Sequence, residues 1–207
     1  MKPFLLMCCL LLFICKNDYS QSLILGVKNT RIAILGYELP CKMGLLLENS
    51  MYVEDVKLQY IRAALFYKFN LLRNINGGIF AYYGQRYNND YYDLGTRFFV
   101  DWHWKIFVFS GALQPLYDSE MKYYTCYSAT VNGYILSDLA LTIGFKNIPE
   151  YRNVEKRAAF GLLFDTPVLK VHPQVSFPIT NEEQLTRISI SFIYYHKFKP
   201  KLANDLY

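Results

Sequence analysis

Polar and apolar side chains alternate through segment after segment of the chain beyond residue 20. The clearest case is 185–198, where apolar residues hold every second position from 188 to 198, interrupted only by His196. These are Ile188, Ile190, Phe192, Tyr194 and Phe198. The same alternation recurs over 57–70, 138–148, 156–165 and 167–178. Successive side chains of a β-strand point to opposite faces of a sheet, so a period of two predicts strands rather than helices.

Turn signals divide the chain into about twelve strands. The strands are predicted at 22–28, 30–38, 42–52, 57–70, 77–87, 91–102, 105–117, 121–136, 138–148, 156–165, 167–178 and 185–198. Two of the turns between them are predicted at 72–77, which includes Asn76-Gly77, and at 102–104. There is no helical stretch, internal repeat or linker, so 21–198 is predicted to be one all-β domain with an antiparallel up-and-down sheet. Ten or eight strands would also fit the pattern.

The first twenty residues differ from the rest and predict a secretory signal peptide. Lys2 precedes an apolar run from Phe4 to Cys15, which is too short for a membrane-spanning helix. Cleavage is expected near Ser20. At the other end of the chain, 199–207 are expected to form a C-terminal tail after the barrel. A lipoprotein acylated at Cys15 is an alternative, which the bulky Ile14 before it disfavours.

Period two alone does not say which face of the sheet is inside. A soluble barrel or sandwich buries its apolar face, whereas a transmembrane barrel turns that face to lipid and keeps a polar lumen. Strand-and-turn units of about 16 residues suit strands of 9–11 residues that cross a bilayer. Aromatic residues also crowd the predicted strand ends, as in the girdles of membrane barrels. The predicted girdle comprises Tyr82, Tyr83, Tyr123, Trp102, Trp104, Phe164 and Phe198.

With these features, the chain resembles the small outer-membrane β-barrel proteins of Gram-negative bacteria. The resemblance covers 22–198 and is architectural, so it identifies no functional residue. It implies outer-membrane lipid as surroundings, export through the signal peptide, and the barrel insertion machinery as a partner. It extends to the last strand, which closes on aromatic Phe198, although 199–207 follow that residue and depart from the pattern.

The predicted topology places both ends of the barrel, and the proline-containing turns, on the periplasmic side. Cys41 would then lie at the periplasmic rim and Cys126 in the outer half of its strand. Because a disulfide needs Cα atoms within about 7 Å, both thiols are expected to stay unpaired.

Charged residues in mid-strand are predicted to face the lumen. They are Glu48, Arg62, Arg97, Asp101, Lys146, Arg157, Lys170 and Arg187. Glu48 and Arg62 lie on neighbouring strands and are expected to pair. The charges would form either a polar plug or a constriction that selects solutes. Basic residues outnumber acidic ones on this face, so an open lumen would prefer anions mildly.

No sequence motif indicates catalysis, a cofactor or a metal site. The best catalytic candidate is His172, with Ser189 or Ser191 on the next strand as nucleophile and Asp165 nearby. Hydroxyl groups and one histidine also occur by chance on any polar strand face, and hydrogen bonding in the lumen is the simpler interpretation. The net charge of +5 includes no long basic run, and we expect no nucleic-acid partner.

The sequence therefore predicts a porin-like outer-membrane barrel: a small pore, or a structural barrel that binds a partner in the envelope. A lipid-acting barrel enzyme and a soluble, secreted lipocalin-like binder are the alternatives.

Overall fold

A computed structural model describes residues 21–29, 31–50, 60–87, 90–120, 122–150, 153–179 and 185–198. The strands in these ranges are β1 (Ser22–Lys28), β2 (Ile32–Glu38), β3 (Met43–Ser50), β4 (Tyr60–Leu72), β5 (Ile75–Arg86), β6 (Tyr92–Trp104), β7 (Phe107–Asp118), β8 (Lys122–Leu136), β9 (Leu139–Glu150), β10 (Asn153–Asp165), β11 (Leu169–Pro178) and β12 (Arg187–Lys197). None of the described residues forms a helix long and apolar enough to cross a membrane.

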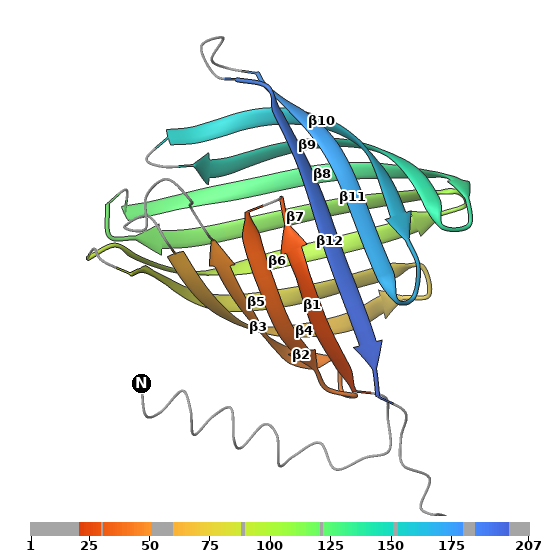
Figure 1. Ribbon diagram of the computed structural model, residues 1–207, viewed down its shortest axis with the longest axis horizontal. Coiled ribbons are helices and arrows are strands. Elements are labelled where there is room, and N and C mark those ends of the chain that lie inside the picture. The colour runs from red at the N-terminus through yellow and green to blue at the C-terminus, as the bar shows by residue number, and fades with distance from the viewer. Residues whose placement is uncertain are drawn as a thin grey trace, which may run out of the picture.

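The strands form a closed, antiparallel, up-and-down barrel (Figure 1). Each strand pairs with its neighbours in the chain, and β1 closes the barrel against β12. This last pairing runs from Ser22 opposite Lys197 to Val27 opposite Phe192, so both ends of the barrel meet at one rim. Closure leaves no sheet edge along the paired stretch, as a bilayer requires. The predicted twelve-strand barrel is confirmed.

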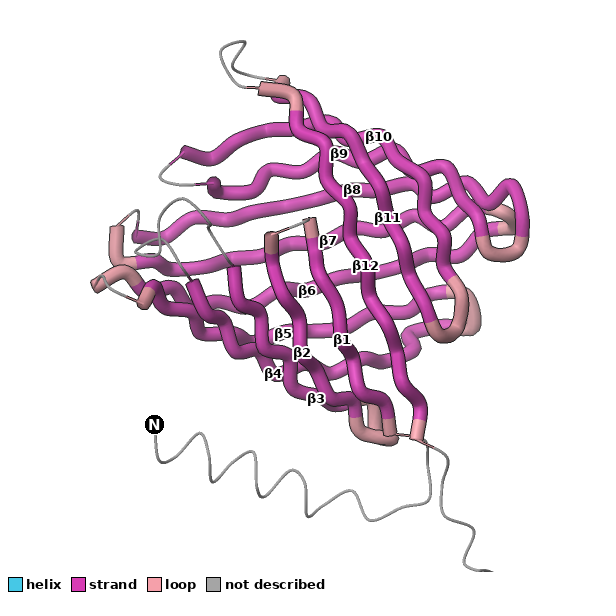
Figure 2. Tube along the Cα trace, in the orientation of Figure 1, coloured by secondary structure: helices cyan, strands magenta, loops and turns pink. Residues whose placement is uncertain are grey.

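The turns gather at the two ends of the barrel, as Figure 2 shows. Two of them are tighter than predicted. Arg73 and Asn74 connect β4 and β5, and Lys105 and Ile106 connect β6 and β7. The turn predicted at 102–104 is wrong because the strand continues through both tryptophans of that segment.

The turn predicted around Asn76-Gly77 is also misplaced, since both residues lie in β5. Glycine is needed there for space rather than for a turn. A Cβ atom on Gly77 would meet Cε2 of Phe69 at 2.9 Å, and one on Gly78 would overlap the Phe99 ring. Asn-Gly favours a hairpin turn in isolation, but packing of these two rings overrides that preference.

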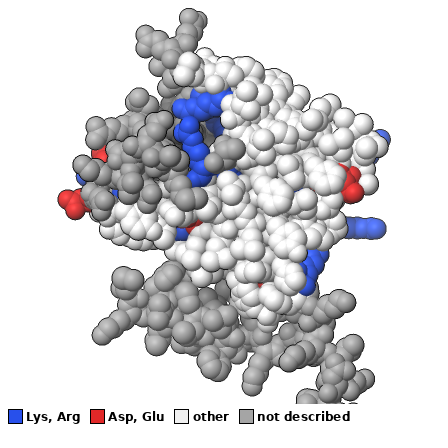
Figure 3. Space-filling view, in the orientation of Figure 1, with Lys and Arg blue, Asp and Glu red and all other residues white. Residues whose placement is uncertain are grey.

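The apolar face of the sheet lies outside. In β9, Leu141 and Ile143 are 53% and 58% exposed. Ala140 and Thr142, which alternate with them along the strand, are 0% and 5% exposed. Burying one such aliphatic side chain is worth about 1.5–3 kcal/mol, so a belt of them requires an apolar surrounding. Figure 3 shows an outer face made up mostly of uncharged groups; a basic patch lies in the upper part of the view, and the other charged groups lie toward the edges. The soluble lipocalin-like alternative, which needs the apolar face inside, is therefore wrong.

Aromatic side chains ring both ends of this outer face. Trp102 stacks on Phe109, with ring centroids 5.2 Å apart, and Trp104 stacks on Phe107 at 6.2 Å. At the other end Tyr117 and Tyr123 meet edge to face at 4.9 Å. The other outward-facing residues of the predicted girdle are Tyr83, Phe164 and Phe198.

Tyr82 does not belong to the girdle, and its prediction as a girdle residue is wrong. It is only 8% exposed and lies inside the barrel. The reason is local: Tyr82 and Tyr83 are consecutive in β5, so only one of them can face lipid.

Candidate functional site

The inner wall of the barrel carries the candidate site, and its best-ordered part is a network around Arg62. The guanidinium of Arg62 lies 3.0 Å from the Asp93 carboxylate and 3.6 Å from that of Glu48. Lys28 approaches the other Glu48 oxygen at 3.6 Å. The predicted pairing of Glu48 with Arg62 is confirmed, since the two face each other across β3 and β4. A buried charge needs such partners to be tolerated.

Two tyrosines complete this network. The Arg62 Nε–H donates to the Tyr60 hydroxyl at 2.8 Å, and that hydroxyl donates in turn to Asp93. Arg62 also stands 4.4 Å from the Tyr82 ring centroid, and the Tyr82 hydroxyl accepts a bond from the Gln114 amide at 2.9 Å. The network thus ties β3, β4, β5, β6 and β7 together across the interior.

Asp93 and Lys28 were not among the predicted lumen charges. Both sit near strand ends, where a charge is most easily taken for part of a loop. Alternation alone could have identified Asp93 as a lumen residue, because it shares the inward face of β6 with Gly95 and Arg97.

An apolar cluster fills the interior beside the network. Ile24, Ile34 and Phe66 are buried, and Phe80 and Ile193 pack against them. The Phe66 and Phe80 rings lie 5.4 Å apart. A uniformly polar lumen does not describe this side of the barrel, where β1, β2, β4 and β5 hold a small core.

The opposite wall, from β8 to β12, is lined by hydroxyl, amide and basic side chains. The Thr142 hydroxyl donates to the Asn132 amide oxygen at 2.9 Å. Lys146 of β9, Arg157 of β10 and Lys170 of β11 follow on the inward face. This wall has the polar character that the sequence predicts.

Arg157 is the most buried of these basic residues, with 2% of its surface exposed. Its guanidinium donates to the Ser176 hydroxyl at 3.1 Å, to the Ser176 carbonyl at 2.7 Å and to the Leu185 carbonyl at 2.9 Å. Arg157 therefore ties β10 to β11 and to the segment before β12. Arg187, at the start of β12, is exposed at the same end of the barrel.

Two other predicted lumen charges lie on β6. Arg97 and Asp101 share its inward face, opposite Phe80 and Asn76 of β5. Asp101 is also opposite Ser110 of β7.

The candidate catalytic residues are close in register but are not joined. His172 lies opposite Ser191, and Gln174 lies opposite Ser189. Among the described residues, the buried His172 Nε2 has no hydrogen-bond partner. Asp165 pairs with Lys170 at 3.0 Å rather than with the histidine.

Ser191 is engaged by the tip of the first hairpin. Its oxygen accepts the Asn29 backbone N–H at 3.0 Å, and the Asn29 side-chain oxygen accepts the Gln174 amide at 3.0 Å. This arrangement supplies no base for the serine. Within the described ranges, no three His, Cys, Asp or Glu side chains gather as a metal site.

The two cysteines of the barrel lie in different environments. Cys126 is a buried, free thiol on the inward face of β8, and Cys41 is exposed in the turn between β2 and β3. The two are not bonded to each other, as predicted.

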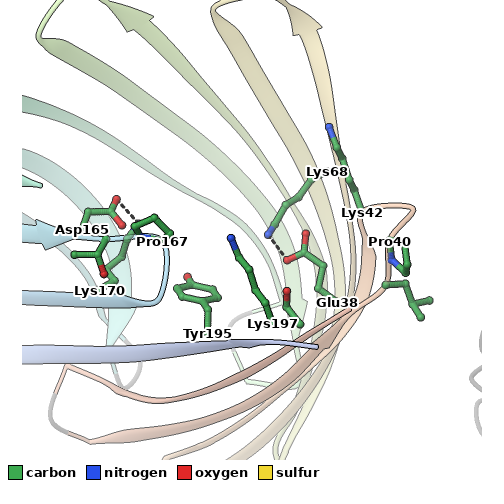
Figure 4. A pocket seen from close by; sticks show the side chains of 12 residues that line it. Glu38, Pro40, Lys42, Lys68, Asp165, Pro167, Lys170, Tyr195 and Lys197 are labelled. Atoms are coloured by element: carbon green, nitrogen blue, oxygen red, sulfur yellow. Dashed lines mark hydrogen bonds and ion pairs between the residues drawn. The ribbon is translucent and has the colours of Figure 1, made fainter. Parts of the chain in front are cut away.

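The lumen opens into a hollow at the rim where β1 begins and β12 ends. Its volume is about 430 Å³. The charged side chains around it are Glu38, Lys42, Lys68, Asp165, Lys170 and Lys197 (Figure 4).

Solved barrels share this architecture. The KdgM porin in complex with disordered oligogalacturonate matches with a TM-score of 0.63 at 8% identity, over 84% of this chain and 98% of that one. A second structure of the KdgM porin matches at 0.60, with the same identity and coverage. The chain has the fold of a porin. The small outer-membrane barrel that the sequence predicts is thereby supported at the level of the fold.

No protein-family model and no curated protein sequence matches the chain.

Proposed function

We propose that this protein is an outer-membrane pore that passes small anionic solutes. The observation that carries the proposal is the excess of basic over acidic side chains on the inward face. The basic residues are Lys28, Arg62, Lys68, Arg86, Arg97, Lys122, Lys146, Arg157, Lys170, Arg187 and Lys197. Among the inward positions whose side chains the structure describes, the acidic residues are Glu38, Glu48, Asp93, Asp101, Asp118 and Asp165. A lumen with one predominant sign of charge concentrates counter-ions of the other sign.

The likeness to a porin holding an oligogalacturonate supports passage of a solute through a barrel of this fold. The orientation belongs to the same proposal. Outer-membrane barrels have short periplasmic turns, and the two-residue turns at 73–74, 105–106 and 137–138 share the end that carries both ends of the barrel. That end is proposed to face the periplasm. Export by a signal peptide at 1–20 and insertion by the barrel machinery complete the proposal.

Ion selectivity tests the proposed pore directly. The folded protein would be placed in a planar bilayer under a gradient of potassium chloride. We expect channels whose reversal potential shows chloride preferred over potassium. Potassium-selective channels would contradict the proposal.

A closed barrel that binds a partner in the envelope is the second candidate. The apolar cluster of Ile24, Ile34 and Phe66 favours it, since these side chains take up lumen space. The same recording separates the two functions, because a closed barrel gives no channels under any gradient.

A further inference from the structure

The hollow at the rim of the lumen has the size and walls of a small-molecule site. Its volume of about 430 Å³ falls within the range of such sites, roughly 300–1,000 Å³. Its lining comes from segments that are distant in sequence: β1, β2 and the turn after it, β4, the β10–β11 hairpin, and β12. In Figure 4, the side chains of Lys68, Lys170 and Lys197 stand around one space rather than along one strand.

Charge in the hollow is only partly balanced. Lys68 is paired with Glu38 at 2.6 Å, and Lys170 with Asp165 at 3.0 Å. Lys42 donates to the neutral Asn70 amide oxygen at 3.1 Å. Lys197 makes no hydrogen bond or ion pair within the part of the chain that the structure describes. Two of the four lysines of the lining are thus paired with carboxylates, and Lys42 turns its ammonium toward Asn70 and away from the other amines, so Lys197 is the cation that a ligand would neutralise first.

The hollow also has an apolar side. The Tyr195 ring lines it and packs against the cluster of Ile24, Ile34 and Phe66. In Figure 4 the ring lies between the Lys170–Asp165 pair and Lys197. A ligand with a short carbon skeleton between its charges would contact this ring, whereas a bare halide ion would gain nothing from it.

We infer that the hollow binds a small organic dianion, such as a dicarboxylate, with Lys197 as its principal ligand. The inference rests on the proposed anion pore, because the hollow is the mouth through which the solute would enter or leave. Lys68 and Lys170 contribute as shared ligands, each already holding a carboxylate of the protein. Shared ligands keep the affinity modest, and a pore needs a bound solute to leave again.

Equilibrium binding tests the site without requiring conduction. The folded protein in detergent would be titrated calorimetrically with succinate, at low salt, beside acetate as the matched monoanion. We expect succinate to bind and acetate to bind more weakly. Absence of succinate binding would overturn the inference.

Two variants and one control locate the binding. Lys197→Gln should weaken succinate binding by about three- to tenfold, since a partly exposed ion pair is lost. Lys105→Gln, the same charge change in an exposed turn at the same end, should leave it unchanged. Glu38→Gln releases Lys68 from its partner and should tighten binding, a result that a misfolded variant does not give. Unchanged affinity in both Lys197→Gln and Glu38→Gln would refute the site.

The binding site and the pore are separate hypotheses, and the two measurements can contradict either one without the other. Succinate binding in a barrel that gives no channels would support the site and contradict the proposed pore. Chloride-selective channels in a barrel that binds no succinate would support the pore and overturn the site.

Discussion

The two sides of the barrel follow the same alternation but use their inward positions differently. The packed side, β1 to β7, holds the Arg62 network and the cluster of Ile24, Ile34 and Phe66. The polar side, β8 to β12, holds hydroxyl groups and the basic residues Lys146, Arg157 and Lys170. One side therefore packs like a protein core, and the other lines the lumen with polar and charged side chains. The comparison teaches that alternation identifies the inner face of a strand but not what that face does.

The largest effect is expected from breaking the network on the packed side. Arg62→Ala leaves Asp93 and Glu48 without their guanidinium, and loss of one partner of a buried pair costs about 3–5 kcal/mol. The free energy of unfolding would be measured by urea titration in lipid vesicles. Arg73→Ala, in an exposed turn, serves as the control and should change it by less than about 0.5 kcal/mol. Equal losses in both variants would show that the network does not hold the packed side together.

The next effect is expected from opening the apolar cluster. Phe66→Ala should cost about 3 kcal/mol of unfolding free energy, because the ring contacts Ile24, Ile34 and Phe80 from inside. It should also raise single-channel conductance, since the ring takes up lumen space. Phe98→Ala removes an outward-facing ring from β6, two strands away, and should leave conductance unchanged. A conductance that rises in the control and not in Phe66→Ala would reverse the assignment of faces.

The sequence predicts the features of this contrast that depend on local alternation or on adjacent strands. It does not predict contacts between strands that are brought together by closure of the barrel. Strand positions and faces follow from local alternation, and Glu48 opposite Arg62 follows from adjacency of their strands. The convergence of Ile24, Ile34 and Phe66 depends on the tilt and stagger of strands around a closed barrel, which no local pattern contains. No turn forms at Asn76-Gly77, because the rings of Phe69 and Phe99 require glycine at positions 77 and 78 within β5. Tyr82 and Tyr83 are consecutive in β5, so alternation puts Tyr82 inside the barrel and Tyr83 in the girdle.

A smaller effect is expected from the polar side, in selectivity rather than stability. Lys146→Gln removes one positive charge from the inward face of β9 and should shift the reversal potential toward potassium. Lys105→Gln removes the same charge outside the lumen and should not shift it. Identical reversal potentials in wild type and Lys146→Gln would show that the polar wall does not set selectivity.

The smallest effects concern the residues of the enzyme alternative. His172→Ala should leave conductance unchanged, and a lipid hydrolysis assay should find no activity to lose. Ser191→Ala removes the hydroxyl that accepts the Asn29 N–H, so a loss of about 1 kcal/mol in unfolding free energy is expected. Lipid hydrolysis by wild type that disappears in either variant would favour the enzyme instead.

Thiol accessibility tests the contrast between the two sides most directly. Thr130 of the polar side and Ala64 of the packed side are both inward-facing. Each would be replaced by cysteine in a Cys41→Ser, Cys126→Ser background, and the folded barrel in vesicles would be treated with a charged, water-soluble maleimide. The account predicts rapid labelling of Thr130→Cys and slow labelling of Ala64→Cys, because Ala64 is only 5% exposed and lies in an apolar cluster, whereas Thr130 is partly exposed. Equal rates, or faster labelling of Ala64→Cys, would contradict it.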